Sequence, residues 1–220
     1  MTRQIQDKLI YNNEEHYLND ELLEYRIREH PHLATKVSGG FTACWRGYVA
    51  TYEIKNFELL LKEVSLIHSE EENEKDIFLN GLFNDLKKQK LTWLNCIIVL
   101  YKNKIIGEFN IPELNSYEEY ELLEIKNGNL TDFKILSQDE YRQFKEEQYA
   151  CFINSEDYEI CKNKFIDSNV KYNEHEKTYL SKSKWKQFIF NEGNFKEMVK
   201  DDILYYTKKF YQANFKNDHH

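Results

Sequence analysis

The sequence predicts an α+β fold, in which an antiparallel β-sheet built from hairpins is followed by a helical C-terminal portion. Three observations predict it. Paired β-rich segments, each pair separated by a two-residue turn, occupy the chain up to residue 136. From Ser137 onward the spacing of apolar residues changes from two to about 3.6, which is the period of an α-helix. The 220 residues, 41% hydrophobic and 15% aromatic, supply enough apolar area for a packed core.

The change of period divides the chain into two parts. Residues 1–136 form a β-rich domain with one or two short helices, and residues 137–220 form a helical C-terminal portion. The spacing alone leaves two arrangements open: the helical portion is a separate domain, or it belongs to the same domain as the sheet. No linker-like stretch rich in Gly or Pro separates them, since the whole chain contains 7 Gly and 2 Pro.

The β-rich segments meet at turn residues that tolerate a positive φ. Asn-Gly is the preferred pair of a type I′ turn, so the turn at Asn127-Gly128 is the clearest. The expected hairpins join 8–11 to 14–18 around Asn12-Asn13, 41–54 to 57–64 around Lys55-Asn56, 91–101 to 104–111 around Lys102-Asn103, and 120–126 to 129–136 around Asn127-Gly128.

Capping residues and apolar spacing locate the helices. Asp20 has the form of an N-cap, and Pro31 ends the helix that follows because it disfavours the α region for its predecessor. Ser137 with Glu140 has the form of a capping box, and Asn194 begins a second such signal. The expected helices cover 20–30, 77–88, a segment starting near 138, 156–167, 181–191 and a segment starting near 194.

The charge of the chain restricts the kind of partner that it binds. The net charge is −8, and residues 1–135 hold 23 acidic against 16 basic side chains, whereas residues 136–220 hold 15 against 14. An acidic first part opposes binding to bulk DNA or to an anionic membrane. A basic protein partner therefore fits this charge better than nucleic acid does.

Motifs of catalysis and of cofactor binding are missing from the sequence. It contains no nucleophile elbow, no Walker loop, no dinucleotide fingerprint and no metalloprotease helix. Cys44, Cys96, Cys151 and Cys161 include no C-x-x-C pair, so we expect buried thiols and no metal site. We expect no cofactor. The longest apolar run is too short for a bilayer, and no leader-like segment is present, which predicts a cytoplasmic protein.

The stretch 41–54 holds the candidate binding residues Trp45, Arg46, Tyr48 and Glu53. In an unbroken strand Arg46 shares a face with Tyr48, whereas Trp45 and Glu53 share the other face. A guanidinium and aromatic surfaces suit an anionic ligand or a protein partner. The alternative is structural: a buried Arg46 paired with a carboxylate of the core. A bulge at Gly47 would exchange the two faces.

The same stretch, Thr42-Ala43-Cys44-Trp45-Arg46-Gly47-Tyr48-Val49-Ala50-Thr51-Tyr52-Glu53-Ile54, resembles an uncharacterised bacterial protein family with the signature T-A-x-W-R-G-Y-x-A-T-W-E-I. The resemblance covers about residues 8–64 and departs at Tyr52, where the family commonly has Trp. It implies a shared β-rich fold, and no activity is established for that family.

Three functions follow as hypotheses. The first is a cytoplasmic protein-binding protein, an immunity or antitoxin-type inhibitor of a cationic partner, for which the acidic first part and the abundant tyrosines argue. The second is a small-molecule-binding domain or an enzyme with a pocket around Arg46. The third is nucleic-acid binding by the lysine-rich stretch 162–186, which the nearly neutral charge of the helical portion makes the weakest. The oligomeric state is open.

Overall fold

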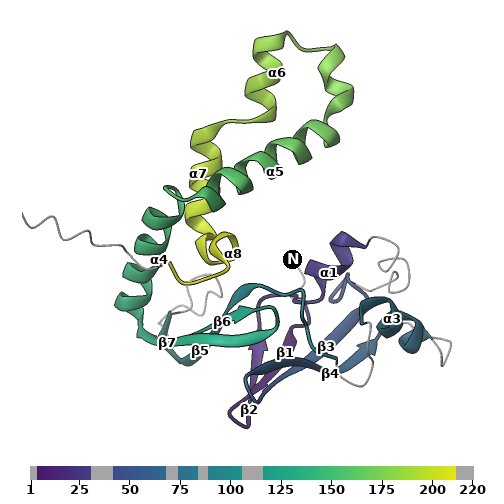
Figure 1. Cartoon of the computed structure of the whole chain (residues 1–220), viewed down its shortest axis with the longest axis vertical. Helices are drawn as coiled ribbons and strands as arrows, with labels where there is room; N and C mark the ends of the chain where they lie inside the picture. Colours follow the sequence, from purple (N-terminus) through teal and green to yellow (C-terminus); the bar gives the residue numbers. More distant parts are fainter. Residues whose placement is uncertain (1–3, 31–41, 68–73, 84–88, 106–115, 212–220) are drawn as a thin grey trace, which may run out of the picture. The chain divides into compact units, whose positions relative to one another are not determined.

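The computed structural model describes residues 4–30, 42–67, 74–83, 89–105 and 116–211, and its fold is α+β. The chain divides into two compact units, Met1–Ser137 and Gln138–His220 (Figure 1). The first, called the sheet unit below, contains every described strand and two helices. The second, called the helical unit, contains helices and their connections in its described residues, 138–211. Each unit is described by itself.

The sheet unit is built on one sheet of seven strands in the order β2-β1-β3-β4-β7-β6-β5. Every pair of neighbours is antiparallel except β1 and β3, which are parallel. The strands are β1 (Asp7–Tyr11), β2 (Glu14–Leu18), β3 (Tyr48–Lys55), β4 (Glu58–Leu66), β5 (Cys96–Ile105), β6 (Ser116–Lys126) and β7 (Asn129–Ser137).

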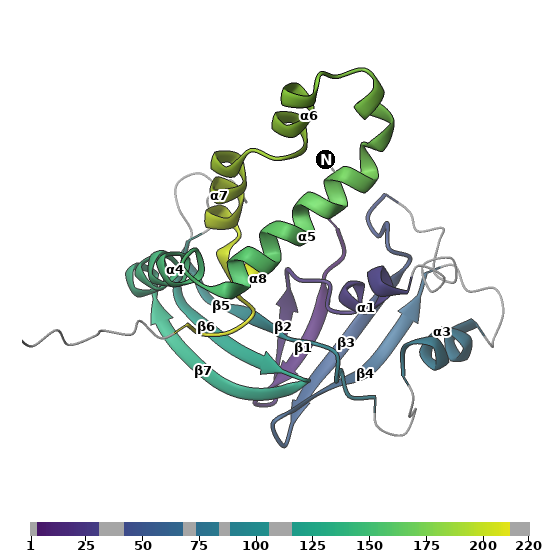
Figure 2. The ribbon, with the colours of Figure 1, turned by 45° about the horizontal axis from the view of Figure 1, so that its top comes forward.

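The sheet is strongly curved, and its two halves meet at a narrow junction. β4 pairs with β7 only at Glu58 and Asn129, so β2-β1-β3-β4 and β7-β6-β5 diverge from that point (Figure 2). At the opposite side the edge strands β2 and β5 approach each other. Burial and then the charge of Lys102 on β5 lower the pKa of His16 on β2. The sheet is therefore nearly closed on itself around its core.

Asparagines with positive φ occupy the connections between paired strands. Asn12 and Asn13 connect β1 to β2, and Asn56 with Phe57 connects β3 to β4. Between β6 and β7, Asn127 has φ 49° and Gly128 has φ 68°, the left-handed values that a type I′ turn requires. The β-rich pattern and these turn residues reflect the same cause, because a tight reversal needs residues that tolerate positive φ.

The turn expected at Lys102-Asn103 is wrong. β5 continues through both residues from Cys96 to Ile105 and pairs along its length with β6. Asn103 does have a positive φ of 54°, and it is skipped in the pairing between Lys102 and Lys104. A left-handed asparagine therefore marks an irregularity within a strand here, and residues 106–111 of the expected partner lie outside the described residues.

The strand expected over 41–54 is too long at its start. β3 begins at Tyr48, and residues 42–47 form turns. Gly47 has φ 76°, a left-handed conformation that interrupts extended backbone. Arg46 and Trp45 are consequently not part of β3, so strand alternation does not apply to them. Phe41 lies outside the described residues.

Two short helices and the inner face of the sheet enclose the core of this unit. α1 (Glu24–Glu29) begins four residues after Asp20, and its N-cap is Leu23, so the predicted cap is wrong. α3 (Glu74–Leu82) begins before the expected position 77. The fully buried core side chains include Leu9, Leu22, Leu23, Tyr48, Tyr52, Phe78, Leu91, Leu94, Ile98 and Leu123.

The helical unit contains α4 (Gln138–Phe152), α5 (Glu156–Tyr172), the 3-10 helix η2 (Glu174–Thr178), α6 (Lys182–Ile189), α7 (Glu192–Asp201) and α8 (Ile203–Thr207). The predicted start near 138 is confirmed. The start near Asn194 is wrong, because the side chain of Asn191 accepts from the Asn194 N–H and caps α7 three residues earlier. The helical segment expected from there is divided between α7 and α8. No described helix is long and apolar enough to cross a membrane.

Candidate binding site

Residues 42–47 form a tight turn ahead of β3, and the start of the chain holds this turn in place. The side-chain amide of Gln4 donates to the Thr42 carbonyl at 2.8 Å and accepts from the Trp45 N–H at 3.1 Å. Gly47 closes the turn, with its N–H bonded to the carbonyl three residues before it. The backbone that carries Trp45 is thus fixed by a residue 41 positions earlier.

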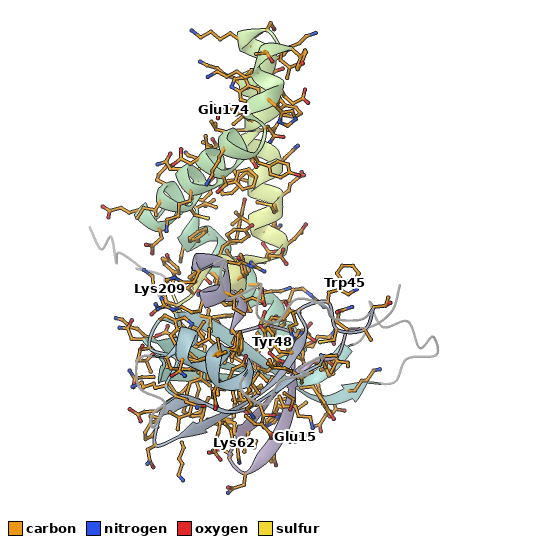
Figure 3. The ribbon with its side chains drawn as sticks, turned by 90° about the vertical axis from the view of Figure 1, so that its right-hand side faces the viewer. Glu15, Trp45, Tyr48, Lys62, Glu174 and Lys209 are labelled. Atoms are coloured by element: carbon orange, nitrogen blue, oxygen red, sulfur yellow. The ribbon has the colours of Figure 1, made fainter. Side chains whose placement is uncertain are left out.

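Trp45 projects from this turn into solvent, whereas Tyr48 lies inside the unit (Figure 3). The Trp45 side chain is 72% exposed. A tryptophan seldom stays so exposed, because it carries one of the largest apolar surfaces of any side chain. A fixed backbone therefore presents a large, unpaired aromatic surface.

Arg46 points the other way, and hydrogen-bond acceptors surround its guanidinium. Its Nη2 donates to Asp7 Oδ1 at 2.7 Å and to the Ile5 carbonyl at 3.0 Å, its Nη1 donates to Glu21 Oε1 at 2.7 Å, and its Nε donates to the Tyr48 carbonyl at 2.9 Å. The side chain is only 6% exposed. The guanidinium joins β1, the segment before α1 and the start of β3.

Asp7 is the buried partner in this arrangement, with 1% exposure. Its Oδ1 also accepts the Ala50 N–H at 2.8 Å, and its Oδ2 accepts the Tyr52 hydroxyl at 3.2 Å. Burial raises the pKa of Asp7 above its usual value, while the Arg46 charge and these hydrogen bonds act in the opposite direction. Burial disfavours the charged form of Arg46, yet the adjacent carboxylates hold the pKa of Arg46 above its usual value.

Two buried tyrosines complete the cluster. The Tyr48 hydroxyl donates to Glu24 Oε1 at 2.9 Å, and the Arg46 guanidinium lies 5.2 Å from the centre of the Tyr48 ring. Burial, reinforced by the charges of Glu24 and Asp7, raises the pKa of Tyr48 well above its usual value. The pKa of Tyr52 is raised in the same way, by burial first and then by Asp7. Both phenols therefore stay protonated and act as hydrogen-bond donors.

Glu53 lies apart from these residues. It follows the buried Tyr52 on β3 and therefore faces the opposite side of the sheet. Its carboxylate pairs with Lys62 of β4 at 3.3 Å. Of the four residues singled out from the sequence, the structure brings Arg46 and Tyr48 together, places Trp45 beside them on the surface, and separates Glu53.

The carboxylates that bind Arg46 and Tyr48 were not identified from the sequence. Asp7 stands two residues before the buried Leu9, so strand alternation places its side chain on the inner face. An acidic residue at an inward position requires a buried cation or several donors. That was the available signal. Glu21 and Glu24 carried none, because acidic residues are common near the start of a helix.

The cluster around Arg46 is better suited to fixing the backbone of the turn than to catalysing a reaction. Arg46 makes four hydrogen bonds to described acceptors, and the carboxylates of Asp7, Glu21 and Glu24 are all engaged by donors. In the described part of the chain no three His, Cys, Asp or Glu side chains are placed to hold a metal ion. What this cluster does physically is to hold the Trp45 turn rigid.

The four cysteines form no disulfide with one another. Cys44, at the base of the Trp45 turn, and Cys96 are buried, as expected. Cys151 and Cys161 are only partly buried, so the expectation is wrong for these two. They lie on α4 and α5, in each of which few residues are buried.

A scan against models of protein families, a search of curated proteins and a search of solved structures each gave no match. The resemblance of residues 8–64 to the family with the T-A-x-W-R-G-Y-x-A-T-W-E-I signature therefore stays a prediction.

Proposed function

We propose that the protein recognises a cationic protein partner through Trp45 and acts as an immunity or antitoxin-type inhibitor of that partner. The observation that carries the proposal is the 72% exposed indole on a turn with a fixed backbone. Tryptophan is among the residues most enriched where binding energy concentrates in protein interfaces. A backbone that is already ordered lowers the entropy lost on association.

The charge of the sheet unit supports a cationic partner. Residues 1–135 contain 23 acidic and 16 basic side chains, so this part of the chain repels anions over long distances. Beside the turn, the Glu21 side chain is 39% exposed even though one of its oxygens bonds Arg46. An exposed indole beside a partly exposed carboxylate, on an acidic part of the chain, matches a partner that carries Lys or Arg around an apolar pocket.

A small-molecule pocket around Arg46 is the less favoured proposal. A guanidinium that recognises an anionic ligand needs free N–H groups directed at that ligand. The Arg46 hydrogen bonds to Asp7, Glu21 and two carbonyls occupy most of these groups. We therefore assign Arg46 to positioning the turn, and its neighbour Trp45 to contact with the partner.

The test is capture of a partner from a lysate of the cells that encode the protein, with three tagged variants compared side by side. These are the unaltered chain, Trp45→Ala and Phe57→Ala. Phe57 is the matched control because its side chain is also 72% exposed and also lies on a turn of the sheet unit. Bound proteins are identified by mass spectrometry, and the complex with the main candidate is then reconstituted from purified proteins.

The expected result is one stoichiometric basic protein that is retained by the unaltered chain and by Phe57→Ala and lost with Trp45→Ala. Truncation of a central interface tryptophan costs about 2 kcal/mol or more, so the dissociation constant should rise roughly thirtyfold. The association rate of the protein with this partner should fall as salt is added. Equal retention by all three variants refutes recognition through Trp45, and a captured partner that is acidic refutes the charge argument.

A further inference from the structure

The end of the helical unit opposite α4 and α8 is a segment whose side chains are exposed. Residues 171–188, called the distal segment here, comprise the last residues of α5, the 3-10 helix η2 and most of α6 (Figure 1). None of these residues is buried. The segment is attached at its base, where the Asn169 side chain donates to the Ile189 carbonyl at 3.0 Å. A folded segment without buried residues contributes little to a core, so its side chains are free for another role.

Large aromatic side chains stand exposed along this segment. Tyr172 is 82% exposed and Tyr179 is 81% exposed. On α6, Trp185 stacks on the exposed Phe188, with 6.1 Å between ring centres and 25° between the planes. The Ser181 side chain accepts the Lys184 N–H and so caps the helix that carries this pair. Aromatic surface gathered on an ordered but unburied segment is typical of an interaction site.

The charge of the distal segment is opposite to that of the protein. Five exposed lysines stand against two glutamates, Glu174 and Glu176, in a chain whose net charge is −8. The described ion pair within the segment joins His175 to Glu176 at 3.1 Å and involves no lysine. Within the described residues none of the five forms an ion pair with a carboxylate. The lysines are Lys171, Lys177, Lys182, Lys184 and Lys186.

We propose that the distal segment binds single-stranded nucleic acid. Unpaired bases stack on aromatic rings, and lysines along the same segment neutralise the phosphates between them. A duplex hides the faces of its bases, so it gains the phosphate contacts but not the stacking. The proposal is independent of the Trp45 surface, because it concerns other residues in the other unit of the chain.

The experiment measures fluorescence anisotropy of labelled single-stranded DNA and RNA of about 12 nucleotides, titrated with the full-length protein. Loss of one stacking contact costs about 1 kcal/mol or more, so Tyr179→Ala should weaken binding at least about fivefold. Tyr205→Ala is the matched control, because Tyr205 is an exposed tyrosine of the helical unit outside the distal segment. It should leave the affinity unchanged. Tyr172→Ala repeats the test at the other end of the segment.

Salt and competitors complete the test. Log affinity should fall linearly with log salt, and Lys182→Gln with Lys184→Gln should reduce the slope by about 1.4, or about 0.7 per phosphate contact. Duplex of the same length should bind more weakly than single strands. Any of three results overturns the proposal. The first is no binding at about 50 mM salt, and the second is an equal loss of affinity with Tyr179→Ala and Tyr205→Ala. The third is displacement of the labelled strand by polyglutamate as readily as by unlabelled single strand, which would assign the segment to acidic protein surfaces.

Discussion

Replacing Asp7 with alanine should destabilise the sheet unit more than any change to an exposed charge. Asp7 is 1% exposed and accepts from Arg46 at 2.7 Å, from the Ala50 N–H at 2.8 Å and from the Tyr52 hydroxyl at 3.2 Å. The substitution removes one acceptor from a buried cation, and it leaves the Ala50 N–H and the O–H of Tyr52 without the acceptor that Asp7 provides. Each of these losses is unfavourable because the groups are buried.

The structure limits the size of the effect. Removal of one partner of a buried ion pair costs about 3–5 kcal/mol, and a buried unsatisfied donor costs about 1–3 kcal/mol. Glu21 still pairs with Arg46 in the variant, so the cation keeps one carboxylate. We therefore expect a loss of about 3 kcal/mol for Asp7→Ala. Asp7→Asn keeps one oxygen as an acceptor and should lose about half as much.

Urea unfolding followed by tryptophan fluorescence and far-UV circular dichroism measures these changes. Glu53→Ala is the control, since it removes a partly exposed carboxylate that pairs with Lys62 and should cost less than about 1 kcal/mol. The double variant Asp7→Ala with Arg46→Met should lose less stability than the two single variants together, because the cation is then no longer stranded. A loss for Asp7→Ala no larger than that for Glu53→Ala would refute the reasoning.

Two further predictions concern the sheet unit. Lowering the pH below about 6.5 should reduce its stability, because burial and then the Lys102 charge hold the pKa of His16 below its usual value, despite Glu14 and Glu121 nearby. The folded state then binds fewer protons than the unfolded chain. The free energy of urea unfolding should therefore be smaller below about pH 6.5 than above it, and His16→Gln should reduce this difference. Gly128→Ala should cost at least about 2 kcal/mol in thermal or urea unfolding, because φ is +68° and the added Cβ meets a backbone carbonyl at 2.6 Å. The same change at Gly193, where φ is ordinary, should shift stability by less than about 1 kcal/mol, and similar losses at both glycines would contradict this account.

The fold class was predictable because the residues that decide it act locally. The period of two before Ser137, the period of 3.6 after it and the Asn-Gly pair each bias a few consecutive residues. Local signals failed where one residue type serves two structures. Asn103 adopts the left-handed conformation of a turn residue, but β5 continues past it. Gly47, in contrast, lies in a turn directly before β3, although the apolar run before it favours extended backbone.

The candidate site was predictable only in part, because its bonds join distant segments. The sequence indicated that a buried Arg46 needs a carboxylate, and Asp7 and Glu21 fill that role. The identity of the carboxylates depends on the parallel pairing of β1 with β3, which no local turn specifies. Trp45 lies in a turn before β3, so the unbroken strand that we expected gave the wrong local structure for this residue.

The long-range bracing of the Trp45 turn also has a consequence for the order in which the protein folds. Gln4 and Asp7 reach the turn and β3 across 38 to 43 positions of chain, whereas a tight reversal such as the one after β1 closes within a few residues. Contacts between distant segments form late, after the loop between them has lost its freedom. Trp45 is therefore held in its native orientation only in a completed sheet unit. A chain shortened by its first eight residues should keep the indole and lose its orientation, so the partner that we propose should distinguish the finished protein from a nascent or clipped one.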